Sequence, residues 1–236
     1  MQTVFIISWT VLATILFGPA MVFASFFSKK GDMPHKIASI WAKSILLASG
    51  VNVKVRGFSN ISPDRSYVFM VNHQSFYDIP VLLAHLRVQF RWLAKEELFR
   101  IPIFGHAMKG ASYISIDRSN RKSAFESLRR AAETIQNGAS VLIFPEGTRS
   151  GDGNISSFKK GGFVLAIDSG VPIVPVIIHG TWSMMARNRL FITPRDVLVE
   201  IRTPIKTSVY SRKTKDDLMK DVRQVICESF GNTIDN

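Results

Sequence analysis

The sequence predicts an α/β fold in which a mixed sheet is flanked by helices and follows an N-terminal two-helix membrane anchor. Three observations lead to this prediction. The 236 residues suffice for one α/β domain with a full core. From residue 51 onward, short apolar stretches alternate with stretches of helical periodicity. Residues 1–28 carry no charged side chain, so we divide the chain into a membrane-associating segment, residues 1–50, and a domain, residues 51–236.

Residues 4–27 form the first predicted helix. At a rise of about 1.5 Å per residue this apolar run is about 36 Å long, enough to cross a bilayer. Gly18 and Pro19 predict a kink, because proline removes a backbone hydrogen bond. Residues 22–24 resemble a signal-peptide cleavage site, which leaves a cleaved signal as the alternative. Against it, residues 2–3 carry no basic charge and the run is longer than an h-region.

The second predicted helix follows a short basic link, residues 29–31. Asp32 is its expected N-cap, Pro34 suits its first turn and Gly50 its C-terminal end. Its apolar face is expected to hold Ile37, Ile40, Trp41, Ile45 and Ala48. We interpret it as an amphipathic helix at the membrane surface, with a core-packed helix as the alternative.

The remaining elements follow from periodicity. Strands are predicted at residues 51–55, 67–71, 111–116, 141–144, 171–178 and 197–201. Residues 121–137 predict a helix, whose inward face is expected to hold Phe125, Leu128, Ala132 and Ile135. A last helix is predicted at residues 215–229, with Thr214 as its cap. The two prolines within 171–178 predict an edge or bulged strand there.

The composition narrows the classes of function. Thirty Lys+Arg against 18 Asp+Glu give a net charge of +12, which favours an anionic partner. The hydrophobic fraction of 46% and the 17 phenylalanines favour an anionic membrane. No nucleic-acid-binding motif accompanies the charge, so nucleic acid is not expected as a partner. The single cysteine, Cys227, excludes an internal disulfide, and the five scattered histidines predict no metal site.

A polar cluster, residues 72–78, directly follows the strand predicted at 67–71. Open α/β sheets place their ligands at the carboxyl ends of strands. His73 and Asp78 are five residues apart. If a helix begins after His73, the Asp78 carboxylate can fold back to one imidazole nitrogen and leave the other as a base. A purely structural hydrogen-bonded pair is the alternative.

A second cluster, residues 144–150, follows the strand predicted at 141–144. Gly147 allows the backbone to approach a ligand closely, and Arg149 offers a planar fork that fits phosphate oxygens. An exposed surface turn is the alternative. Two weaker signals lie between the clusters: Lys95 before two glutamates, and Arg118 at the end of a strand. Taken alone, a solvated helix turn is the favoured interpretation of the first signal and a local ion pair that of the second.

Four sequence blocks, made up of the two clusters, the Lys95 segment and the strand with two prolines, resemble those of the glycerolipid acyltransferase family in sequence and in order. The resemblance is specifically to the bacterial 1-acyl-sn-glycerol-3-phosphate (lysophosphatidic acid) acyltransferases. That family's blocks are Asn-His-x4-Asp, Lys-x-Glu-Leu with a later arginine, Phe-Pro-Glu-Gly-Thr-Arg-Ser and Val-Pro-Ile-Val-Pro-Val. They match residues 72–78, 95–98, 144–150 and 171–176. The third block is highly specific. The resemblance implies the glycerolipid acyltransferase fold for the domain.

The resemblance also implies an activity. An acyl group would pass from acyl-carrier protein or coenzyme A, the co-substrate, to the sn-2 hydroxyl of lysophosphatidic acid, giving phosphatidic acid without other cofactors. His73 would act as general base, held by Asp78. The acceptor's phosphate would be bound by Arg149, Lys95 and Arg118. The pocket would be shaped by Asn72, Glu146, Gly147 and Thr148, with the Gly147 N–H as a candidate oxyanion donor.

A one-step transfer agrees with the residues, because the chain has no Gly-x-Ser-x-Gly nucleophile motif. Another lysolipid acceptor remains the alternative within the same chemistry. A non-catalytic lipid-binding membrane protein is the alternative outside it.

The charge distribution also predicts a location. Lys29, Lys30, Lys36 and Lys43 follow the uncharged segment, which places the domain at the cytoplasmic face of a bacterial inner membrane. We expect the anchor to enter one leaflet rather than to span.

Overall fold

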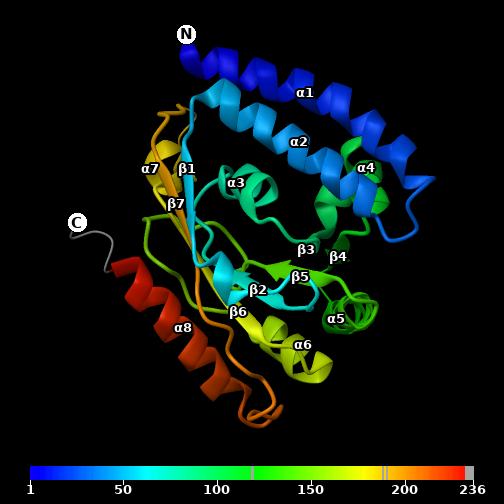
Figure 1. Ribbon diagram of the computed structural model, residues 1–236, viewed down its shortest axis with the longest axis vertical. Coiled ribbons are helices and arrows are strands. Elements are labelled where there is room, and N and C mark those ends of the chain that lie inside the picture. The colour runs from blue at the N-terminus through cyan, green and yellow to red at the C-terminus, as the bar shows by residue number, and fades with distance from the viewer. Residues whose placement is uncertain (118–119, 188, 190, 232–236) are drawn as a thin grey trace.

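The protein is described by a computed structural model that covers residues 1–117, 120–187, 189 and 191–231 (Figure 1). Two N-terminal helices, α1 (Gln2–Ser25) and α2 (Asp32–Ser49), lie side by side across one end of an α/β domain. The strands of that domain are β1 (Val53–Arg56), β2 (Val68–Val71), β3 (Phe90–Lys95), β4 (Ile114–Ile116), β5 (Ser140–Ile143), β6 (Ile173–His179) and β7 (Val197–Ile201).

These strands form one mixed sheet in the order β1-β7-β6-β2-β5-β3-β4. Strands β2 to β6 run parallel to one another, whereas β7 pairs antiparallel with β6 and parallel with β1. The predicted mixed α/β fold is therefore confirmed. We call α1 and α2 together the N-terminal hairpin. The α-helices that follow it are α3 (Asp78–His85), α4 (Phe104–Gly110), α5 (Arg121–Gln136), α6 (Gly161–Ser169), α7 (Thr181–Met184) and α8 (Lys215–Gly231). Two 3-10 helices are also present, η1 (Phe58–Asn60) and η2 (Glu96–Arg100).

Helices cover both faces of the sheet, because successive side chains of its central strands point to opposite sides. On β2, Phe69 and Val71 join a core beneath α1 to α4, whereas Val68 and Met70 join a second core against α5, α6 and α8. All four side chains are fully buried. The continuous apolar run of this strand is thus explained by burial on both faces.

The strand predicted at an edge because of its prolines is in fact central. β6 is buried along its whole length and pairs with β2 on one side and β7 on the other. The prediction of an edge was wrong, but a bulge is present. Ile173 pairs with Ile205, and Val176 pairs with Ile201. The two paired positions are therefore three residues apart on β6 but four residues apart on the segment opposite it, which leaves one extra residue there. The bulge lies where Pro175 offers no N–H to the ladder.

The N-terminal hairpin packs closely on the domain. Gly31, with φ of 74°, is the N-cap of α2 in place of the predicted Asp32, whose carboxylate instead pairs with the buried Arg91 of β3 at 2.5 Å. The α2 face that packs on α1 and α3 also differs from the predicted one: it holds Ala38, Ala42, Ile45, Leu46 and Ser49. The apolar Ile40 and Leu47 are exposed on the opposite side.

α1 is one continuous helix through Pro19. Within the described part of the chain it is the one helix long and apolar enough to cross a membrane. Ile6, Ala13 and Met21 face inward, while most of its large apolar side chains are exposed.

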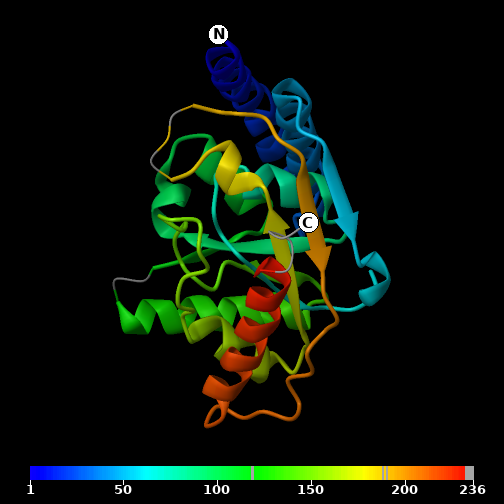
Figure 2. The same cartoon turned by 90° about the vertical axis from the view of Figure 1, so that its left-hand side faces the viewer.

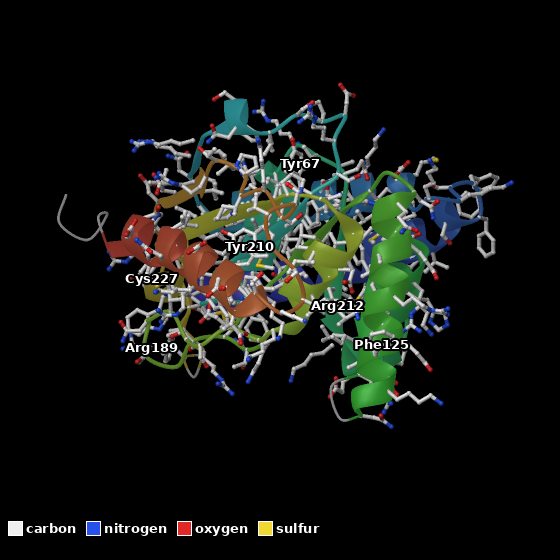
Figure 3. All side chains as sticks on the ribbon, turned by 90° about the horizontal axis from the view of Figure 1, so that it is seen from below. Tyr67, Phe125, Arg189, Tyr210, Arg212 and Cys227 are labelled. Atoms are coloured by element: carbon white, nitrogen blue, oxygen red, sulfur yellow. The ribbon has the colours of Figure 1, made fainter. Side chains whose placement is uncertain are left out.

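The predicted inward face of α5 needs one correction. Phe125, labelled in Figure 3, is 57% exposed, whereas Ala131 and Ile135 are buried in the core between α5 and the sheet. The inward face of α5 therefore differs from the predicted face in the N-terminal half of the helix, where Phe125 points to solvent.

Candidate active site

The two polar clusters found in the sequence meet at one edge of the sheet. Parallel pairing of β2 with β5, and of β5 with β3, brings the carboxyl ends of these strands together. The segments that follow β4, β5 and β6 lie along the left side of Figure 2. The site lies at this edge, as expected for the ligands of open α/β sheets.

His73 and Asp78 form the predicted pair. The distance from His73 Nδ1 to Asp78 Oδ2 is 2.8 Å, because α3 begins at Asp78 and returns the carboxylate to the imidazole. Asp78 is fully buried and its Oδ2 also accepts the backbone N–H groups of Gln74 and Ser75. Its Oδ1 accepts the Thr181 hydroxyl at 2.6 Å. These donors fix the carboxylate, which in turn fixes the His73 ring and leaves Nε2 for a substrate.

The imidazole is also held from one side by an aromatic ring. Phe144, the first residue of the second cluster, stacks on His73 with ring centroids 3.8 Å apart and planes 10° apart. This stacking hinders the His73 ring from turning out of the orientation in which Nδ1 contacts Asp78. An apolar face against the ring also reduces its contact with water.

Asn72 and Glu146 act on the backbone rather than in the pocket. The Asn72 side-chain amide donates to the Ile178 carbonyl and accepts the Ile178 N–H, which joins the ends of β2 and β6. The Glu146 carboxylate accepts the N–H groups of His73 at 2.7 Å and Ser156 at 2.8 Å. Burial raises the Glu146 pKa above its ordinary value, and these two hydrogen bonds oppose that shift. Neither side chain is among those that line the cavity described below, so any part that Asn72 and Glu146 play in shaping the pocket is through the backbone.

Gly147 supports a tight turn. Its φ of 77° lies in the region that glycine adopts without strain, and its N–H donates to the Phe144 carbonyl at 3.0 Å. That N–H is therefore engaged in the turn, and its predicted role as an oxyanion donor is not supported. The turn is tied to the first cluster because the Ser150 N–H donates to the His73 carbonyl at 2.8 Å. Thr148 lies exposed on the turn and lines the cavity described below.

Two of the three predicted phosphate-binding residues line the same cavity as His73. The Arg149 guanidinium stacks over the Phe76 ring at 3.5 Å, and its Nη1 is buried without a hydrogen-bond partner among the described residues. Burial, and then the charge of Arg187, lower the Arg149 pKa below its ordinary value, while Asp78 opposes them. Lys95, the last residue of β3, is exposed and lines the same cavity. Arg118 falls outside the described residues.

A cavity of about 690 Å³ joins these groups to the N-terminal hairpin. The polar and charged residues that line it include His73, Lys95, Thr148, Arg149 and Arg187. Its other walls are mainly apolar and come from α1, α2, α3, β3 and α4, including Phe17, Met21, Trp41, Leu83, Trp92 and Met108. The cavity can hold an apolar chain while presenting a polar group to the dyad. No cluster of three or more His, Cys, Asp or Glu suited to a metal ion occurs in the described ranges.

Sequence reasoning missed three contributors to the site: Phe144 as the ring that stacks on His73, Thr181 and Arg187. Thr181 comes two residues after the end of β6, at the same edge of the sheet as the two clusters. The rule that ligands lie at strand ends could have drawn attention to it. Arg187 lines the cavity from the segment after α7, and no recognisable motif surrounds it in the sequence.

Comparisons with known proteins agree with this geometry. The family model described as Acyltransferase matches residues 52–179. A chloroplastic 1-acyl-sn-glycerol-3-phosphate acyltransferase of Brassica napus is 38% identical over 198 residues, which are 83% of this chain and 56% of that protein. One of Chlamydomonas reinhardtii is 32% identical over 97% of this chain and 69% of the algal protein. The chain thus spans little more than half the length of the first of these relatives.

A solved structure extends the likeness to the whole fold. The crystal structure of the 1-acyl-sn-glycerophosphate acyltransferase from Thermotoga maritima superposes with a TM-score of 0.84 at 29% identity, covering 100% of this chain and 95% of that one. The family match contains both polar clusters, and the structural match includes the hairpin. The chain therefore belongs to the acyltransferase family, as the four sequence blocks predicted.

Proposed function

We propose that this protein transfers an acyl group from an acyl thioester to the sn-2 hydroxyl of 1-acyl-sn-glycerol-3-phosphate, giving phosphatidic acid. The observation that carries the proposal is the cavity, whose largely apolar wall also holds His73 of the His-Asp pair and the cations Lys95, Arg149 and Arg187. A lysophosphatidic acid has a hydroxyl, a phosphate and an acyl chain to match these features. The names of the Brassica, Chlamydomonas and Thermotoga relatives give the same substrate.

The chemistry follows from the orientation of His73. Its Nε2 takes the proton of the acceptor hydroxyl as that oxygen attacks the thioester carbonyl carbon. The new C–O bond forms, the C–S bond breaks, and the imidazolium returns the proton to the departing thiolate. Asp78 accepts the Nδ1–H throughout and stabilises the imidazolium. No side chain of the protein is acylated in this scheme.

The acceptor's phosphate is bound by cationic residues that line the cavity. The planar guanidinium of Arg149 stacks on Phe76, and its Nη1 has no hydrogen-bond partner in the described part of the chain. It can therefore donate hydrogen bonds to a bound anion. Lys95 supplies a second charge from the end of β3. The apolar walls contributed by α1 and α2 receive an acyl chain.

The donor is acyl-carrier protein or coenzyme A carrying the acyl group as a thioester. No further cofactor is needed, because the thioester is already activated and the base is a side chain. The net charge of +12 suits either anionic donor.

The site is at the cytoplasmic face of a bacterial inner membrane, where such thioesters are made. The exposed apolar residues of α1, among them Phe5, Leu12 and Leu16, support contact with lipid. An active site at the lipid surface avoids extracting the lysolipid or its product into water.

Product analysis tests the function. Purified protein is given palmitoyl-acyl-carrier protein or palmitoyl-coenzyme A with lysophosphatidic acid, lysophosphatidylcholine, lysophosphatidylethanolamine or monoacylglycerol. We expect phosphatidic acid as the main product. Preferred acylation of another lysolipid, with lysophosphatidic acid left unreacted, would replace the acceptor while keeping the chemistry. Absence of acylation with every acceptor and both donors would contradict the enzyme activity.

A further inference from the structure

The segment after β6 is tied to the catalytic pair at two points. The Thr181 hydroxyl donates to Asp78 Oδ1 at 2.6 Å, and the Ser75 hydroxyl donates to the Met185 carbonyl at 2.8 Å. Thr181 and Ser75 are fully buried. Arg187 comes two residues after the second point. The segment that leads to Arg187 is therefore tied to the first polar cluster by these two hydrogen bonds.

Arg187 faces the site from this segment. It lines the cavity together with His73 and Arg149, and its Nη1 lies 3.4 Å from the Arg149 carbonyl oxygen. Its charge is close enough to lower the pKa of the Arg149 guanidinium. Two arginines thus adjoin one another in the wall of the cavity.

These cations have no carboxylate partner in the described ranges. The ion pairs formed there include neither Arg149 nor Arg187, and Lys95 is absent from them too. Neighbouring like charges oppose one another unless an anion joins them. Because Arg149 Nη1 is also buried without a partner in the described residues, the arrangement is suited to an anion that contacts both arginines.

We propose that Arg187 is a second arginine of the acceptor's phosphate site and binds, together with Arg149, the phosphate monoester of the lysolipid. This rests on the proposed function and extends it by one residue outside the four sequence blocks. A phosphate monoester carries about 1.5 to 2 negative charges near pH 7 and three acceptor oxygens. One guanidinium pairs with at most two of these oxygens, so a second one completes the site.

The same chemistry could also come from the phosphates of the acyl donor. The two sources are separated by varying one substrate at a time. We compare the wild type with Arg187→Gln, which removes the charge and keeps a polar, though shorter, side chain. The matched control is Arg189→Gln: Arg189 is exposed on the same segment, is labelled in Figure 3, and does not line the cavity.

In Arg187→Gln, we expect kcat/KM for lysophosphatidic acid to fall about 10- to 150-fold, mostly through KM, as expected for loss of one hydrogen bond between charged groups. The KM of the acyl donor and the rate with monoacylglycerol, which has no phosphate, should stay within about twofold of wild type. Arg189→Gln should resemble the wild type. Arg187→Lys should recover part of the loss, because it restores the charge without the fork.

Two results would overturn the assignment: an unchanged KM for lysophosphatidic acid in Arg187→Gln, or a raised KM for the donor alone, which would give Arg187 to the donor's phosphates. Thermal unfolding of the variant checks that it is folded, which its exposed position favours. A wild-type protein that acylates monoacylglycerol but not lysophosphatidic acid would instead contradict the proposed function itself, so the two failures are distinguishable.

Discussion

At the residue scale, the orientation of His73 depends on contacts from both polar clusters. Asp78 holds Nδ1, Phe144 covers one ring face, and Glu146 and Ser150 fix its backbone N–H and carbonyl. Such a ring is positioned before the substrate arrives, which reduces the reorganisation needed during the reaction.

The first prediction follows from this arrangement. His73→Ala should lower kcat by at least about 10²- to 10⁴-fold, the usual contribution of a general base, while leaving thermal unfolding and membrane binding close to wild type. Phosphatidic acid formation from lysophosphatidic acid is the measurement. His106→Ala is the control, because His106 is exposed on α4 and does not line the cavity. Substantial activity in a pure His73→Ala preparation would contradict the mechanism.

The sequence could predict some of these residues but not others. His73 and Asp78 were predictable because their contact is local: a helix that begins at Asp78 returns the carboxylate to His73. The structural roles of Asn72 and Glu146 were not, because their partners Ile178 and Ser156 lie in other segments and become neighbours only through the sheet. Arg187 was missed for the same reason.

At the element scale, periodicity predicted the elements that are long or uniformly apolar and missed those that are not. Strand β3 was missed because a charged residue, Arg91, lies inside it; the guanidinium is buried by the α1–α2 connection, where it bonds the Lys30 carbonyl and Asp32. Helices α4 and α6 are short, and α6 begins with two glycines, which local propensity disfavours. In each case tertiary packing decides the structure.

The second prediction concerns the close approach of the hairpin to the domain. Gly31 and Gly50 flank α2 and have similar φ values, 74° and 66°. A Cβ on Gly31 would lie 2.5 Å from the Ala111 carbonyl carbon, whereas one on Gly50 would meet nothing within 4 Å. Gly50→Ala should therefore lower the free energy of unfolding by about 1 kcal/mol, the penalty for alanine in the left-handed conformation. Gly31→Ala should lower it clearly more, because a steric clash is added. Denaturant unfolding in detergent measures both; equal losses would contradict this account of the hairpin.

The third prediction concerns acid stability and His35 of α2. Its Nδ1 lies 3.0 Å from the Tyr113 hydroxyl, and the ring is 3% exposed. Burial, and then the charge of Arg91, lower its pKa from 6.5 to about 3, although Asp32 opposes them. Between these pH values the unfolded chain binds a proton that the folded protein does not, so stability falls as pH falls, by about 1.4 kcal/mol per pH unit.

His35→Gln removes this titration. From pH 6.5 to pH 4.5 the wild type should lose more unfolding free energy than the variant, by about 2 to 3 kcal/mol in total. His106→Gln serves as the control, because that histidine is exposed. Parallel losses in the wild type and His35→Gln would show that His35 is not buried in its neutral form.

At the scale of the whole molecule, the position of α1 bears on how the protein meets the membrane. The helix contacts the domain near both of its ends: Thr3 exchanges hydrogen bonds with the Ile192 backbone, and Gly18 lies against Ile103. Thr3 and Gly18 lie about 22 Å apart along the helix axis, so a spanning α1 with these contacts would draw the Ile192 and Ile103 segments to different depths within the bilayer. An in-plane helix keeps both segments at one surface, where Phe191 and Ile103 are themselves exposed. We therefore favour an anchor that enters one leaflet.

The last prediction tests that orientation by cysteine labelling in intact cells. Cys227→Ala removes the native thiol, and Gln2→Cys places one at the start of α1 without disturbing Thr3. A membrane-impermeant maleimide should label position 2 only after the cells are opened. Lys213→Cys, on an exposed loop before α8, reports the side on which the domain lies and should behave in the same way. Labelling of position 2 from outside, with position 213 protected, would mean that α1 spans the membrane and that its contacts with Ile192 are broken in the bilayer.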